Sequence, residues 1–156
     1  MAPYCQMHFQ QKEADMNIRR NIFAALSIVA ITSPAWASNT VKVIESGEGG
    51  GPMTITLDRP LIKAGDTTFV VHNDAVTEEH EMVLVKLKSA DQKIDVVASK
   101  HRVDEKNLKS LGEVADLKPG KDGKLKAKLA PGSYLLFCNI KGHYEAGMHS
   151  LLTVTK

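Results

Sequence analysis

Short runs of β-branched and aromatic residues, separated by turn-forming residues, constrain the fold of this chain more than any other feature of its sequence. Such runs, with Gly, Pro, Asp and Asn between them, are typical of an antiparallel β-sandwich. The predicted strands are residues 41–45, 53–57, 67–71, 82–87, 125–129, 134–138 and 150–155. We therefore expect an all-β protein in which two sheets enclose one core.

One longer connection, residues 91–117, interrupts this regular spacing of strands and turns. Asp104 and Glu105 resemble a helix start, Leu108 and Leu111 are three residues apart, and Gly112 resembles a helix stop. These signals predict one short helix within the connection.

The N-terminal segment has the features of an export signal. Two arginines, Arg19 and Arg20, precede an apolar run at residues 22–31, and Ala35-Trp36-Ala37 matches a small-x-small cleavage site. We predict that residues 1–37 are an N-terminal extension and a cleaved signal peptide, and that residues 38–156 are one periplasmic domain. Residues 1–15 are polar and patternless, so Met16 is an alternative start.

The apolar run at residues 22–31 is shorter than the roughly 20 residues that cross a bilayer. No comparable run follows it, so we expect no stable membrane insertion of the mature chain. An uncleaved membrane anchor remains the alternative. The formal net charge of the whole chain is only +2, which argues against nucleic acid as a partner.

Only one of the two cysteines, Cys138, lies within residues 38–156. It therefore has no internal disulfide partner in an oxidising compartment. A free thiol there indicates either metal ligation or an inert, buried cysteine.

Cys138, His143 and Met148 follow one another at intervals of five residues. A thiolate, an imidazole and a thioether together suit a metal that alternates between Cu(I) and Cu(II), because hard cations prefer oxygen and zinc rarely accepts methionine. This short segment therefore predicts ligands for one copper ion.

A single loop does not fix a metal site, so a further ligand is expected from a separate and rigid element. His80 opens the predicted strand at residues 82–87 and is the obvious candidate. Two imidazole nitrogens and a thiolate in one plane, with a longer axial methionine bond, form the blue-copper electron-transfer arrangement.

These motifs resemble the small exported cupredoxins, the type 1 blue-copper proteins that include plastocyanin, pseudoazurin and azurin. The resemblance covers nearly all of residues 38–156, and the matching positions are Asn73, His80, Tyr134 to Asn139, Gly142, His143, Gly147 and Met148. It implies a Greek-key β-sandwich, and it implies that His80, Cys138 and His143 are equatorial ligands and Met148 the axial one. It also implies a hydrogen bond from the Glu81 N–H to the thiolate, although Glu81 departs from the small polar residue usual there.

The same resemblance implies a one-electron carrier between transient redox partners, and not an enzyme. We expect a monomer in which His143 is the edge for electron entry and exit. Around it, Gly142, Ala146 and Gly147 would form a small docking surface. Its rim would carry Lys141, Glu145, Glu78 and Glu79.

Other interpretations remain open at this stage. Each of the four residues alone would more often be a packing or strand-end residue, but the glycines at 142 and 147 favour a tight loop around a metal. A periplasmic protein for copper delivery, homeostasis or resistance would use similar ligands, usually with more methionines. A cysteine hydrolase would place its thiol at a helix N-terminus, whereas Cys138 ends a predicted strand. The remaining histidines of the domain, His72, His101 and His149, are predicted to be surface residues.

Overall fold

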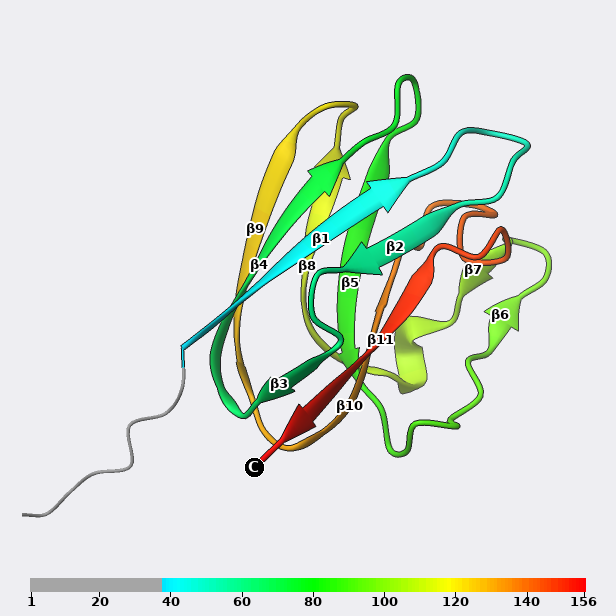
Figure 1. Ribbon diagram of the computed structural model, residues 1–156. Coiled ribbons are helices and arrows are strands. Elements are labelled where there is room, and N and C mark those ends of the chain that lie inside the picture. The colour runs from blue at the N-terminus through cyan, green and yellow to red at the C-terminus, as the bar shows by residue number, and fades with distance from the viewer. Residues whose placement is uncertain (1–37) are drawn as a thin grey trace, which may run out of the picture. The chain divides into compact units, whose positions relative to one another are not determined.

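The computed structural model describes residues 38–156, which form two β-sheets packed face to face (Figure 1). The predicted extension and signal peptide, residues 1–37, lie outside the described residues. Within residues 38–156, no helix is long and apolar enough to cross a membrane. The strands are β1 (Asn39–Ser46), β2 (Thr54–Leu57), β3 (Leu61–Lys63), β4 (Gly65–Asn73), β5 (His80–Lys86), β6 (Val96–Val97), β7 (Arg102–Val103), β8 (Lys109–Leu117), β9 (Asp122–Leu129), β10 (Gly132–Phe137) and β11 (His149–Thr155).

The two sheets mix antiparallel and parallel pairs. The first has the order β2-β1-β4-β9 and the second the order β3-β11-β10-β5-β8, while β6 and β7 form a separate hairpin. Two pairs, β1 with β4 and β11 with β3, are parallel, and all others are antiparallel. The predicted all-β sandwich is therefore confirmed, although it is not purely antiparallel.

Alternating side chains on each strand fill the space between the sheets. Val41 and Val43 of β1 are fully buried, whereas Lys42 between them is exposed. Strands β5 and β10 are instead buried on both faces. Their inner residues join the main core, and their outer residues form a second apolar cluster under residues 94–108.

The prediction of a helix in the long connection was wrong. The described chain forms only a 3₁₀ helix, η1 (Glu105–Asn107), whose N-cap Asp104 accepts a hydrogen bond from the Lys106 N–H at 3.2 Å. Strand β8 then pairs with β5, with Gly112 opposite Leu84 and Ser110 opposite Val85, so that Leu111 lies unpaired at a shift in register. The free edge of β5 takes up the backbone hydrogen bonds of this segment, and Gly112, with φ of 128°, lies at an irregularity of the strand.

The predicted strands agree with the structure. Each predicted strand overlaps an observed one, usually with an extension of one to three residues. The strands that the sequence did not indicate, β3, β6, β7 and β8, are short or lie at sheet edges.

We expect Phe69→Ala to lower the free energy of unfolding by about 3–5 kcal/mol, because this fully buried ring lies in the main core and its loss leaves a cavity. Val76→Ala, at a side chain that is 82% exposed, is the control and should change stability by less than about 0.5 kcal/mol. Urea denaturation of both variants measures the difference, and equal midpoints would contradict this assignment of the core.

Candidate metal centre

The pairing of β5 with β10 brings the first two predicted ligands to one end of the sandwich. These strands run antiparallel with Phe137 opposite Val83. His80 is the first residue of β5, and Cys138 directly follows the last residue of β10. The end of one strand therefore lies beside the start of the other, although the two residues are far apart in sequence.

His143 and Met148 lie in the connection between β10 and β11, which we call the donor loop (residues 138–148) (Figure 1). Hydrogen bonds within the loop fold it into tight turns: His143 N–H donates to Ile140 O, Ala146 N–H to Gly142 O, and Gly147 N–H to Tyr144 O. Gly142 and Gly147 have φ values of 85° and 103°, which side chains with a Cβ rarely adopt.

Three of the predicted ligands meet in a group that fits one metal ion. The ligating atoms of His80, Cys138 and His143 all lie within 4.8 Å of one another. The Cys138 Sγ is 3.4 Å from His143 Nδ1, which is 3.3 Å from His80 Nδ1. A metal ion bonds such donors at roughly 2.0–2.3 Å, so three donors around one ion would lie about 3.5 Å from one another. The observed distances are close to this value, and the three side chains would need little movement to bind a metal ion.

Met148 is held next to the same residues through its backbone. Its N–H donates to the His143 carbonyl at 3.0 Å, and its carbonyl accepts from the Cys138 N–H at 3.1 Å. The side chain is fully buried in the apolar cluster that also contains Cys138. The Met148 backbone is therefore fixed next to Cys138 and His143, and its buried side chain belongs to the same apolar cluster as Cys138.

A backbone carbonyl orients the His80 ring. The Nε2 atom of His80 lies 3.3 Å from the carbonyl oxygen of Gly47, which leaves Nδ1 facing Cys138 and His143. A Cβ on Gly47 would lie 2.7 Å from the Cγ of Met53, and the residue has φ of 133°. No sequence pattern indicates this role of Gly47, because a carbonyl contact depends on backbone position alone.

Backbone N–H groups also hydrogen-bond to the sulfur. The N–H groups of Glu81 and Ile140 both donate to Cys138 and lower its pKa, but burial outweighs them and raises the pKa to about 12. The Glu81 contact is the one that the family resemblance implied, while the Ile140 contact was not foreseen. Burial likewise lowers the pKa of His80 and of His143, so both imidazoles are kept neutral and able to ligate.

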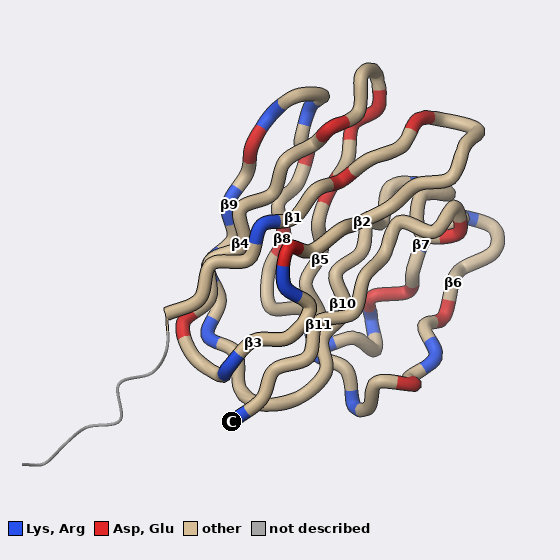
Figure 2. The backbone as a smooth tube through the Cα atoms, in the orientation of Figure 1, with Lys and Arg blue, Asp and Glu red and all other residues tan. Residues whose placement is uncertain are grey.

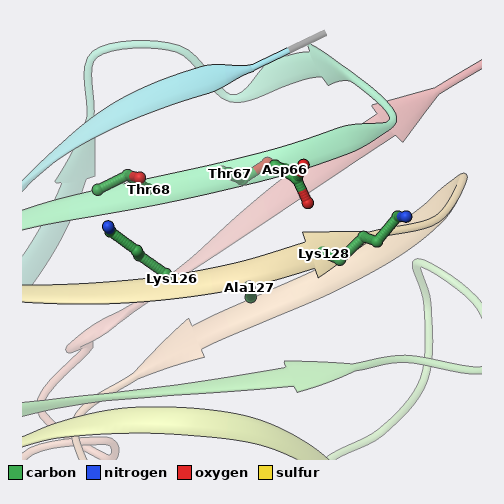
Figure 3. Close-up of a pocket in the computed structure, with 6 residues that line it drawn as sticks. All are labelled: Asp66, Thr67, Thr68, Lys126, Ala127 and Lys128. Carbon is green, nitrogen blue, oxygen red and sulfur yellow. The ribbon is translucent and has the colours of Figure 1, made fainter. Parts of the chain in front are cut away.

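A cleft of about 650 Å³ adjoins His143. Its walls are Gly49–Gly51 and Met53 on one side and residues 140–143 with Ala146 on the other, while Glu78 and Lys141 bring opposite charges. Acidic and basic residues are likewise interspersed over the rest of the described chain (Figure 2). Another hollow, of about 290 Å³, lies between β4 and β9 (Figure 3). Its lining of Asp66, Thr67, Thr68, Lys126, Ala127 and Lys128 contains no Cys, His or Met and so does not suit a soft metal.

The histidines predicted to be surface residues lie outside the donor group. His72 Nδ1 is 2.8 Å from Asp122 Oδ1, and the exposed His149 ring packs against Tyr144. His101 is exposed as well, but its ring lies 2.9 Å from Glu145 of the donor loop, a contact that the sequence did not indicate.

Comparison with known proteins identifies the fold. No protein-family model and no curated protein matches the chain. The structure is similar to auracyanin from Roseiflexus castenholzii (20% identity, TM-score 0.54, 78% of this chain and 100% of that chain). It is also similar to auracyanin A from Chloroflexus aurantiacus, described as a "blue" copper protein (21%, 0.54, 76% and 100%), and to rusticyanin from Thiobacillus ferrooxidans (15%, 0.57, 78% and 79%). The described chain therefore has the cupredoxin fold.

The carboxyl group of Glu45 is buried without a hydrogen-bond partner among the described residues. Glu45 lies in β1 and is fully buried. Burial, together with the nearby charge of Glu81, raises its pKa to about 8. The group is therefore held in its neutral form at neutral pH, as expected for a carboxyl group removed from water.

This raised pKa makes the stability of the metal-free protein depend on pH. Below pH 4.5 Glu45 is protonated in both states, but between pH 4.5 and about 8 only the unfolded chain releases the proton. We therefore expect stability to fall over this interval, by an amount on the order of a few kcal/mol, and Glu45→Gln to remove most of the fall. Urea denaturation at several pH values measures it. The exposed Glu113→Gln is the control, and an unchanged slope in Glu45→Gln would contradict the assignment.

Proposed function

We propose that this chain binds one copper ion through His80, Cys138, His143 and Met148 and carries single electrons between redox proteins. The observation that carries the proposal is the buried group of one thiol and two imidazoles within 4.8 Å, with the buried Met148 hydrogen-bonded through its backbone to Cys138 and His143. Soft sulfur and imidazole donors in this combination suit both oxidation states of copper. Bound copper would supply the reversible one-electron chemistry.

The protein would contribute a donor arrangement that changes little between oxidation states. His80 is fixed by Gly47 and the strand start, and the donor loop is fixed by its own hydrogen bonds. Small rearrangement favours fast electron transfer. The two N–H donors to the Cys138 sulfur would help to stabilise its thiolate form.

His143 would be the exit for the electron, since it is the predicted ligand that lines the cleft. The glycines and Ala146 around it leave a surface with few large side chains, which suits a small and short-lived contact with a partner. The predicted signal peptide supports a location in the periplasm.

A visible absorption spectrum after addition of Cu(II) tests the proposal. We expect an intense thiolate-to-copper charge-transfer band in the wild type and none in Cys138→Ser, which should stay folded because the sandwich has its own core. His149→Ala, an exposed histidine outside the donor group, should keep the band. A band that survives in Cys138→Ser would refute the ligand assignment, and a colourless protein that quickly loses Cu(I) to a chelator would indicate copper delivery.

Met148→Gln should keep copper but lower its reduction potential, because an amide oxygen is a harder donor than a thioether and favours Cu(II) over Cu(I). Met82→Leu, a conservative change at a buried methionine of the core, is the matched control and should leave the potential nearly unchanged. Protein-film voltammetry measures both. Equal potentials in Met148→Gln and the wild type would argue against axial ligation.

A further inference from the structure

The segment before β8 lies over the outer face of the second sheet. Ile94, Val96, Val103 and Leu108 cover the outward side chains of β5 and β10 in the second apolar cluster. Tyr144 of the donor loop packs against the same cluster, with its ring edge-on to Phe137 at 5.9 Å. This segment and the donor loop therefore share one apolar base, and Figure 1 shows β7 beside the loop.

Residues 101–105 of this segment also bind the donor loop through polar contacts. The Asn139 side chain accepts a hydrogen bond from the Val103 N–H at 2.6 Å and donates to the Val103 carbonyl at 3.2 Å and to Glu105 Oε1 at 2.6 Å. Its amide group is thus fully engaged, and the residue is buried. Asn139 directly follows Cys138, so these contacts fix the backbone next to the sulfur.

His101 makes the second attachment. Its carbonyl accepts from the Gly142 N–H at 2.8 Å, and its ring contacts Glu145. The residue has φ of 52°, a left-handed conformation that few non-glycine residues adopt and that needs support from its surroundings. It therefore holds the loop on either side of His143.

The hydrogen bonds inside the donor loop set its shape but not its position relative to His80. On one side, the Met53 N–H of the connection after β1 donates to the Ala146 carbonyl at 3.0 Å. On the other side, Asn139 connects the loop to β5, because its backbone N–H donates at 3.1 Å to the Oε1 of Glu81, the residue that follows His80. Position thus depends on contacts from outside the loop.

We propose that residues 101–105 form a clamp on the donor loop and that Asn139 is the positioning residue through which the clamp holds Cys138 against His80. The functional role of this clamp depends on the copper site proposed above. The clamp keeps the loop close to its metal-binding geometry before the metal arrives, and it limits movement of Cys138 and His143 during electron transfer.

The copper-loaded full chain provides the first test. We expect Asn139→Ala to lose copper to a chelator about 10- to 100-fold faster than the wild type, with an altered Cu(II) electron paramagnetic resonance spectrum. Glu105→Ala should show a smaller change in the same direction, and Glu105→Gln, which keeps an oxygen acceptor, should restore the wild-type rate. Asn107→Ala is the matched control, since Asn107 is exposed on the same 3₁₀ helix and has no hydrogen bond to the donor loop.

Amide hydrogen exchange in the metal-free protein provides a second test that does not depend on copper. Asn139→Ala and Glu105→Ala should speed exchange in residues 140–146 by about tenfold, with no change in β1 and β4. If the wild type bound no copper, the proposed function would be wrong. The exchange rates would still show whether residues 101–105 hold the donor loop. The clamp proposal would be overturned if both variants lost copper and exchanged amide hydrogens at rates within twofold of the wild type. If Asn139→Ala does not fold, the two Glu105 variants decide.

Discussion

The antiparallel pairing of β5 with β10 is the constraint on which the rest of the site depends. It places the start of one strand beside the end of the other, so that His80 and Cys138 meet at one end of the sandwich. Both strands are buried on two faces, by the main core on one side and by the cluster under residues 94–108 on the other. A shift of one residue in this register would turn every side chain of β10 to the opposite face and break both clusters, so the packing of the whole domain sets this register.

The surroundings of the donors favour neutral, available ligands over charged ones. Burial lowers the pKa of both imidazoles, and the Gly47 carbonyl holds the His80 ring with Nδ1 toward the sulfur. Two backbone N–H groups partly offset the effect of burial on the thiol. Glu45 follows the same rule, since its pKa is raised and it stays neutral inside the sandwich. A copper ion would thus enter a site whose dipoles are already oriented, as the proposed electron carrier requires.

The sequence was sufficient for the elements whose pattern is local. Alternating residues and turn glycines predicted the main strands, and the spacing of Cys138, His143 and Met148 predicted the loop donors. His80 followed from the need for a ligand on a separate element, and the structure brings it to the same group. The predicted helix failed because the free edge of β5 pairs with residues 109–117, a tertiary effect that propensity does not contain. The roles of Gly47, Ile140, His101 and Asn139 depend on backbone groups or long-range contacts, and no local pattern indicates them.

The central claim is that these distant side chains bind one copper ion together. X-ray absorption at the copper edge of the loaded protein tests it most directly, because it reports the type and number of atoms bonded to the metal. We expect two nitrogen donors and one short sulfur bond, with at most one longer sulfur contact. A copper environment of only nitrogen and oxygen atoms, with no short sulfur bond, would contradict it.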